Sequence, residues 1–496
     1  DGQGRVVSLG ERDCSLQRRN QKVVEETPAP GLSQALRQRL HAAARALGEA
    51  VRYESAGTVE FIYDVSREDF YFLEVNTRLQ VEHPVTECVY GIDLVEWMIR
   101  QAAGELQLPA QQSLQPRGAA IEVRLYAENP QRGFQPSAGL LTEVRFADDI
   151  RVDGWIETGT EVSAYYDPML AKLIAHDVDR DAAIGKLSRA LQQSSVAGIE
   201  TNLDYLRAII GSEVFASGAV ATSVLKDFAF APPVIEVLVP GAQTSLQDDP
   251  GRLGYWHVGI PPSGPMDARS FRLANRAVGN APGTAALECT MLGPTLRFHH
   301  EALIALAGAE MAATLDERAI PYYEPITVRA GQTLRLGRIG GLGQRSYLAV
   351  RGGFDAPEYL GSRACFSLGG FGGHASGVLR VGDCLHIGTA PALDAAIIAI
   401  DERPRLQHAW TLAVHYGPHG APDFFTDDDI DALFSARYEV HFNSARTGVR
   451  LIGPRPRWAR SDGGEAGLHP SNIHDNAYAI GAIDFTGDMP IILGPD

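Results

Sequence analysis

Two glutamates that flank a short polar turn are the residues whose spacing most clearly points to chemistry. Glu60 lies in the run 58–63 and Glu74 in the run 70–76, and the turn-like segment 64–69 separates the two runs. β-branched and aromatic residues fill most positions of both runs, which is typical of paired strands. The stretch is therefore predicted to form a β-hairpin that carries one carboxylate on each strand.

The register of the predicted hairpin decides what these carboxylates can do. Directly opposed side chains lie about 5 Å apart, and like charges at that separation are destabilising. A hard cation with oxygen ligands would hold the carboxylates together, and Mg²⁺ (or Mn²⁺) that also contacts substrate phosphates fits best. The alternative is a solvated sheet face on which both glutamates point into water. A turn centred near Arg67 gives the pairs Glu60 with Glu74, Ile62 with Phe72 and Thr58 with Asn76.

A row of polar side chains follows the hairpin at alternate positions. If the chain stays extended, Asn76, Arg78, Gln80 and Glu82 lie on one face. The guanidinium fork of Arg78 could bind a small oxyanion through two hydrogen bonds. The carboxylate of Glu82 could act as a general base. This row favours a metal and oxyanion site over a solvated sheet face.

The composition excludes several classes of protein. A chain of 496 residues predicts two to four domains, and 45% hydrophobic with 21% charged residues is ordinary for a soluble enzyme. The net charge of −17 argues against a nucleic-acid surface, and the apolar runs are too short to span a membrane. The five cysteines have no Cys-x-x-Cys spacing, which favours a reducing, cytoplasmic setting without a zinc site.

The remaining elements are placed from hydrophobic periodicity and breakers. Amphipathic helices are expected over 31–51 and 92–103, and further helices over 181–193 and 202–210. A strand is expected to begin near Gly118. The paired prolines of the segment 229–233 indicate a linker, and frequent glycines and short strands beyond it indicate an all-β module.

The first half of the chain resembles the biotin carboxylase family. The segments that carry the resemblance are Glu74-Val-Asn-Thr-Arg-Leu-Gln-Val-Glu-His-Pro-Val-Thr-Glu87, similar to the ATP-grasp signature, and Asp13-Cys-Ser-Leu-Gln-Arg-Arg-Asn-Gln-Lys-Val-Val-Glu-Glu26. The resemblance implies that Glu60, Glu74 and Asn76 serve a metal–ATP site. It also implies that Arg78, Gln80 and the backbone of Val81 hold bicarbonate, with Glu82 as the base, Lys22 near bicarbonate, Gln17 near ATP or biotin, and Arg124 stabilising the biotin enolate.

The second half resembles the carboxyltransferase domain of the urea carboxylase family. The motifs are 240–248, 251–267, which contains Pro-Pro-Ser-Gly-Pro-Met-Asp, 287–290, 471–481 and 484–490. The resemblance implies paired cyclophilin-like β-barrels, cut short at the C-terminus, with Asn472, Asp475 and Asp484 as candidate acceptor contacts. Urea-preferring members tend to have Asn at the place of Asp484, and a carboxylate there would favour cationic guanidine. The alternative for Asp484 is an exposed acid at a strand end.

Together the two resemblances imply a multidomain α+β chain. The expected parts are the C-terminal part of an ATP-grasp domain over 1–105, a biotin carboxylase C-terminal domain over 106–228, a linker over 229–234 and a carboxyltransferase domain over 235–496. Because the chain begins at Asp1 and has no phosphate loop or Met-Lys-Met biotin site, we expect an internal piece of a longer protein. That piece alone is expected to lack carboxylase activity.

The implied reaction joins two sites. ATP, Mg²⁺ and bicarbonate give carboxyphosphate at the first, and biotin on a biotin carboxyl carrier domain outside this chain takes the carboxyl group to the second. There urea, yielding allophanate, or guanidine is carboxylated, and an allophanate hydrolase, fused or separate, would act next. The alternative is a Kip-like or 5-oxoprolinase-type binding module fused to an ATP-grasp remnant. Acetyl-CoA and pyruvate carboxylases use other carboxyltransferase folds, which the β-rich second half does not fit.

Overall fold

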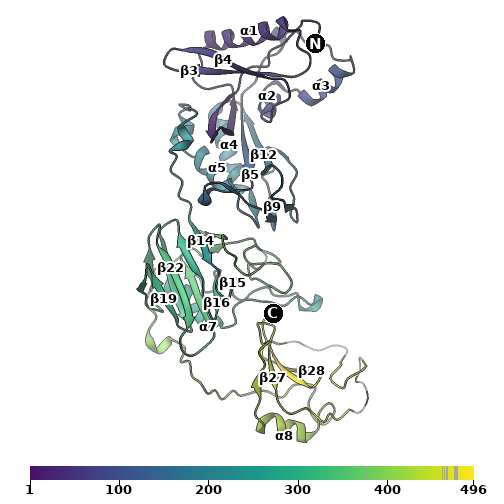
Figure 1. The fold of residues 1–496 in the computed structure, drawn as a ribbon. Coiled ribbons are helices and arrows are strands. Elements are labelled where there is room, and N and C mark those ends of the chain that lie inside the picture. Colours follow the sequence, from purple (N-terminus) through teal and green to yellow (C-terminus); the bar gives the residue numbers. More distant parts are fainter. Residues whose placement is uncertain (376, 461, 463, 465–466, 474–478) are drawn as a thin grey trace. The chain divides into compact units, whose positions relative to one another are not determined.

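The computed structural model describes residues 1–375, 377–460, 462, 464, 467–473 and 479–496 (Figure 1). The chain forms two compact units, Asp1–Phe230 and Ala231–Asp496. Each unit has its own cluster of buried apolar residues. Each is therefore described by itself.

A five-stranded antiparallel sheet forms the centre of the first unit. All eight residues of its middle strand are buried, because helices cover both faces of that strand. Residues alternate between the faces of a strand, so Ala120 packs with Val85 and Val89 of α2, whereas Ile121 and Val123 join the larger core. The strands, in sheet order, are β1 (Asp13–Arg18), β2 (Gln21–Thr27), β5 (Ala119–Tyr126), β12 (Met169–Asp177) and β10 (Arg151–Gly154).

Several helices of the first unit begin at a side chain that accepts a backbone hydrogen bond. Ser33, Asp93 and Asp179 cap α1, α3 and α4, satisfying N–H groups that the first turn leaves unpaired. The four expected helices are confirmed, and α2 and α6 are additional. The helices are α1 (Gln34–Ala50), α2 (His83–Tyr90), α3 (Leu94–Ala102), α4 (Arg180–Gln193), α5 (Leu203–Ile210) and α6 (Glu213–Ala216).

The predicted hairpin is present as β3 (Thr58–Asp64) and β4 (Asp69–Asn76). Glu60 lies opposite Glu74, and Thr58 opposite Asn76, so these two predictions are confirmed. The predicted pairing of Ile62 with Phe72 is wrong. A register shift between Glu60 and Phe61 inserts one extra residue, as a β-bulge does, so that Ile62 faces Tyr71 and Phe61 faces Phe72.

Short paired strands complete the first unit. They form two-stranded ladders in the segment between β5 and α5. Their bounds are β6 (Glu128–Asn129), β7 (Gln135–Pro136), β8 (Gly139–Leu140), β9 (Glu143–Arg145), β11 (Glu161–Val162) and β13 (Ser195–Ala197).

Two antiparallel sheets and a smaller third one make up the second unit. The seven-stranded sheet has β14 (Val234–Val239), β17 (Thr295–Phe298), β19 (Met311–Leu315), β20 (Arg318–Ala319), β22 (Thr333–Ile339), β24 (Phe354–Asp355) and β25 (Cys384–Ile387). The five-stranded sheet has β15 (Gln243–Gln247), β16 (Ala286–Thr290), β18 (Ala302–Gly308), β21 (Ile326–Val328) and β23 (Arg345–Val350). The third sheet has β26 (Glu439–Val440), β27 (Gly448–Ile452), β28 (Ile483–Thr486) and β29 (Met489–Leu493).

Two details of this unit differ from the prediction. It is not all-β, because α7 (Ala268–Ala277) and α8 (Asp427–Ser435) interrupt the strands. Asp267 caps α7, and Phe271 and Ala274 pack in the core, an amphipathic pattern that the glycine-rich surroundings obscured. The sheets have free edge strands, and the described residues form no closed barrel. In the described part of the chain, no helix is both long and apolar enough to cross a membrane.

Candidate active site

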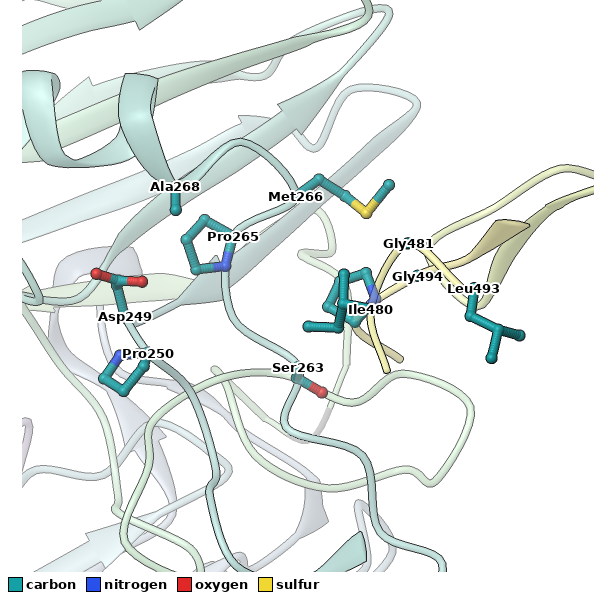
Figure 2. Close-up of a pocket in the computed structure, with 11 residues that line it drawn as sticks. Asp249, Pro250, Ser263, Pro265, Met266, Ala268, Ile480, Gly481, Leu493 and Gly494 are labelled. Atoms are coloured by element: carbon teal, nitrogen blue, oxygen red, sulfur yellow. The ribbon is translucent and has the colours of Figure 1, made fainter. Parts of the chain in front are cut away.

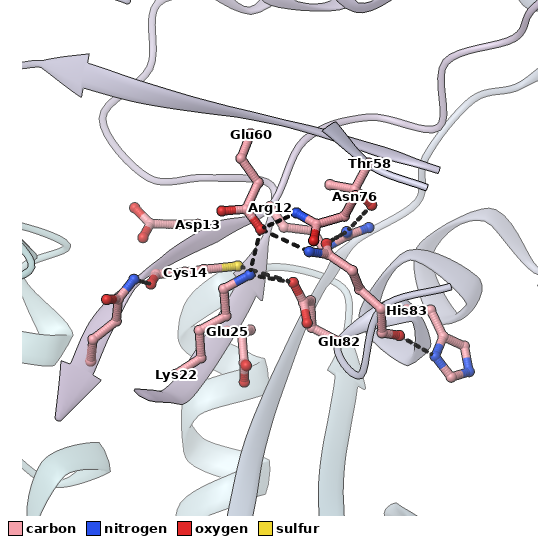
Figure 3. Close-up of polar contacts among 12 residues, drawn as sticks. Arg12, Asp13, Cys14, Lys22, Glu25, Thr58, Glu60, Asn76, Glu82 and His83 are labelled. Carbon is pink, nitrogen blue, oxygen red and sulfur yellow. Dashed lines mark hydrogen bonds and ion pairs between the residues drawn. The ribbon is translucent and has the colours of Figure 1, made fainter. Parts of the chain in front are cut away.

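Lys22 is the cation at the centre of the polar cluster in the first unit (Figure 3). Its Nζ donates to Glu60 Oε1 at 3.0 Å and to Glu82 Oε1 at 2.8 Å. The β1–β2 ladder places Gln17 opposite Lys22, and the Gln17 amide donates to the Cys14 carbonyl at 2.9 Å. Four of the predicted site residues therefore lie together, although they come from three separate segments of the chain.

The carboxylates of Glu60 and Glu74 both accept a hydrogen bond from the side-chain amide of Asn76. Asn76 Nδ2 donates to Glu60 Oε1 and to Glu74 Oε1, each at 3.1 Å, and Gln80 Nε2 donates to Glu60 Oε1 at 2.7 Å. Two carboxylates and an amide oxygen are the donor types that Mg²⁺ prefers, so the residues fit the predicted metal. No cluster of three or more His, Cys, Asp or Glu side chains suited to a metal occurs among the residues that the structure describes.

Glu82 lies between two cations and is 2% exposed. Arg124 Nη2 lies 2.9 Å from Glu82 Oε2, on the side away from Lys22. Burial by itself would raise the pKa of Glu82, but the charge of Arg12 and the hydrogen bond and charge of Lys22 outweigh it and lower that pKa. Glu82 is therefore held as a carboxylate, the form that can accept a proton. The preceding carbonyl, of Val81, accepts a hydrogen bond from Lys172 Nζ at 3.0 Å.

The chain does not stay extended after the hairpin, contrary to the expectation. β4 ends at Asn76, and the chain turns before α2 begins at His83. Gln80 and Glu82 still reach the cluster, because the turn folds them back toward Glu60 and Lys22. Arg78 does not: it is exposed, its Nη1 donates to the Leu79 carbonyl at 3.3 Å, and it forms no ion pair in the described part of the chain.

Three cluster residues were not identified from the sequence. Arg12 donates to Thr58 Oγ1, Gln80 Oε1 and Thr86 Oγ1, each at 3.0 Å, and so ties the hairpin to the start of α2. Glu25 and Glu122 are fully buried beside Arg124. Two features of the sequence could have pointed to these residues. Arg12 follows Glu11 directly before Asp13, and Glu122 is the single charged residue of the apolar run 119–123.

The predicted acceptor contacts of the second unit are not brought together by any described interaction. Asp484 lies on β28 opposite Ile491 and is half-buried, and its side chain makes no hydrogen bond or ion pair within the described residues. The side-chain amide of Asn472 donates to the Gly467 carbonyl. Asp475 lies outside the described residues. The roles of these residues stay predictions.

A cavity of about 310 Å³ lies elsewhere in the second unit (Figure 2). One side is formed by Ser263 and Met266, and the other by Ile480 and Leu493. The cavity has the volume of a small ligand site. The Ser263 hydroxyl is buried and lacks a hydrogen-bond partner in the described part of the chain. Asp484 does not belong to the lining.

Family models match three consecutive parts of the chain. Residues 1–110 match the carbamoyl-phosphate synthase L chain, ATP binding domain, and residues 122–227 match the biotin carboxylase C-terminal domain. Residues 258–496 match the carboxyltransferase domain, subdomain A and B. A biotin carboxylase part followed by a carboxyltransferase part defines the class of biotin-dependent carboxylases.

Individual relatives narrow this class. The urea amidolyase of Saccharomyces cerevisiae is 52% identical over 504 residues, covering 100% of this chain and 27% of that protein. A putative urea carboxylase of Emericella nidulans is 43% identical over 518 residues, covering 100% and 41%. The crystal structure of the Kluyveromyces lactis urea carboxylase matches with a TM-score of 0.96 at 52% identity, covering 100% and 45%. Over its whole length the chain is similar to urea carboxylases, and it spans less than half the length of these relatives.

Proposed function

We propose that the protein containing this chain carboxylates urea to allophanate, consuming ATP and bicarbonate and using biotin. The observation that carries the proposal is a buried carboxylate, Glu82, fixed between Lys22 and Arg124. The relatives named urea amidolyase and urea carboxylase support urea as the acceptor. Five free cysteines support a reducing, cytoplasmic location for the enzyme.

The first step would take place at the cluster of the first unit. Glu60, Glu74 and Asn76 would hold Mg²⁺, which would neutralise charge on the phosphates of ATP. Glu82 would remove the proton from bicarbonate, and its lowered pKa keeps it ionised for this task. The groups proposed to hold the bicarbonate anion are Lys22, Arg78, Gln80 and the backbone of Val81.

Arg124 would act on the biotin ring, with Gln17 near ATP or biotin. A guanidinium that is already fixed beside Glu82 would stabilise an oxyanion that develops during the reaction. It would lower the activation barrier because little reorganisation is needed. Biotin, when bound, supplies the ring nitrogen that accepts the carboxyl group. A biotin carboxyl carrier domain would bring biotin to both units, and an allophanate hydrolase would consume the product.

The acceptor is proposed to contact Asn472, Asp475 and Asp484. A carboxylate at position 484 would pair with the cationic guanidinium of guanidine, whereas urea is neutral. We therefore propose that guanidine is at least as good an acceptor as urea.

The test uses the intact enzyme. Bicarbonate-dependent ATP cleavage is measured with urea and with guanidine, in the wild type and in Asp484→Asn. We expect stimulation by both acceptors in the wild type and a shift in preference toward urea in the variant. Asp462→Asn is the control, because Asp462 is exposed and not proposed to contact the acceptor. Stimulation by urea alone would contradict the guanidine proposal, and stimulation by neither would contradict the proposed function.

A further inference from the structure

Two buried carboxyl groups lie directly opposite each other behind the proposed bicarbonate site. β2 pairs with β5 in antiparallel register, and Glu25 is the register partner of Glu122. Opposed side chains on one sheet face are about 5 Å apart. Both glutamates are 0% exposed, so water cannot screen the repulsion between two negative charges.

The two carboxyl groups have unequal partners. Arg124 Nη2 lies 2.5 Å from Glu25 Oε1 and 2.9 Å from Glu82 Oε2, so one nitrogen serves two carboxyl groups. Glu122 forms no ion pair within the described residues. The side-chain oxygens of both glutamates are buried without a hydrogen-bond partner there, so the ion pair with Arg124 is what distinguishes Glu25 from Glu122. A buried carboxylate without a partner is so unfavourable that such a group takes up a proton instead.

The charged groups around the pair do not remove the difference between Glu25, which has an ion-pair partner, and Glu122, which has none within the described residues. Burial raises the pKa of Glu122 well above the ordinary value of a glutamate, and the negative charge of Glu25 adds to that rise. Burial raises the pKa of Glu25 to about 7, against the opposing charge of Arg124. The titratable and charged groups that face the pair are Cys14 on β1, Lys22 on β2, Arg124 and Tyr126 on β5, Lys172 on β12, and Glu82 just before α2.

We propose that Glu122 carries a proton that it shares with Glu25, so that the pair holds one negative charge, and that Glu25 is thereby a positioning residue for Arg124. With one charge, the pair holds the guanidinium against β2 while the guanidinium still contacts Glu82. Two charges on the pair would place an unbalanced negative charge beside the single positive charge of Arg124, and no charge would leave Arg124 tied to Glu82 alone. The assigned role in bicarbonate activation rests on the proposed function, but the protonation of the pair does not.

Infrared spectroscopy tests the shared proton independently of activity. The difference spectrum between the intact wild-type protein and Glu122→Gln at neutral pH should lose the carbonyl-stretch band of a protonated carboxyl group, a band that shifts in D₂O. Glu26→Gln is the matched control. Glu26 neighbours Glu25 on β2, but it forms an ion pair with Arg180 at 2.6 Å. Its replacement should remove carboxylate bands only. Loss of only carboxylate bands in Glu122→Gln would overturn the proposal.

The pH dependence of bicarbonate-dependent ATP cleavage tests the positioning role. As the pH rises through neutrality, Glu25 becomes ionised and holds Arg124, so wild-type activity should rise there. Glu25→Gln should lose this rise and lower kcat by about tenfold or more, as expected when a buried ion pair loses one partner. Glu26→Gln and Glu122→Gln should retain the rise, because Glu25 still titrates. A purely structural role would lower activity without changing the profile, so a rise retained in Glu25→Gln would overturn the positioning role.

Discussion

Replacement of Arg446 by methionine should strongly destabilise the second unit. The Arg446 guanidinium is buried and makes four hydrogen bonds: Nη1 to Glu288 Oε1 at 2.7 Å, Nε and Nη2 to Asp496 at 2.7 and 2.8 Å, and Nη2 to the Gly264 carbonyl at 2.7 Å. These contacts join strand β16, the loop before α7 and the segment after β29. Methionine keeps much of the side-chain volume but supplies none of the hydrogen bonds.

The magnitude follows from what the substitution leaves behind. Removing one partner of a buried ion pair typically costs about 3–5 kcal/mol, because the other charge stays buried. Glu288 keeps Arg345 at 3.2 Å and the Tyr347 hydroxyl at 2.9 Å, so most of the loss falls on Asp496, whose side chain is 4% exposed. We therefore expect the free energy of unfolding to fall by the lower end of this range, about 3 kcal/mol. This corresponds to roughly a hundredfold change in the unfolding equilibrium constant.

Hydrogen exchange of the intact protein, followed by mass spectrometry, measures this change locally. Amides of β16 and β27 should exchange roughly a hundredfold faster in Arg446→Met, because their protection reports the opening free energy. Arg455→Met is the control. Arg455 is 83% exposed and lies 3.7 Å from Asp488, so its loss should change exchange by about twofold or less. Equal, small effects in both variants would refute the argument from buried charge.

Two further predictions concern Glu82 in the intact enzyme. Glu82→Gln should reduce bicarbonate-dependent ATP cleavage by about 10²- to 10⁴-fold, the usual contribution of a positioned general base, while the KM for ATP changes little; a loss below tenfold would argue against Glu82 as the base. Arg12→Leu should move the acidic limb of the pH profile to higher pH, because the charge of Arg12 lowers the pKa of Glu82 and its loss favours the protonated form. An unmoved limb would show that Arg12 does not set this pKa.

Local rules predicted the hairpin because its pairing involves neighbouring residues. Alternation and a short polar turn sufficed to place Glu60 opposite Glu74. The bulge beside Glu60 has no comparable signal, and it displaced the expected partner of Ile62. The turn after Asn76 was also missed, because the alternating polar residues read equally well as an extended strand.

Long-range pairings were beyond those rules. Glu25 and Glu122 meet only because β2 pairs with β5, and no local pattern specifies which distant strands become neighbours. The same holds for the contact of Arg12 with Thr58. The two segments with the longest resemblance supplied most of the predicted site residues, and the structure brings them together except for Arg78, which stays exposed.

One oxygen atom connects the proposed metal and bicarbonate functions. Glu60 Oε1 accepts hydrogen bonds from Lys22, Asn76 and Gln80 at 3.0, 3.1 and 2.7 Å. Three donors at a single carboxylate oxygen compete for its lone pairs, so loss of this oxygen to another partner would release the Gln80 amide and leave the Lys22 ammonium with its contact to Glu82 alone. Both are groups proposed to hold bicarbonate. Occupation of the hairpin carboxylates by the proposed metal would therefore change the availability of the proposed anion-binding groups, because both depend on the same oxygen of Glu60.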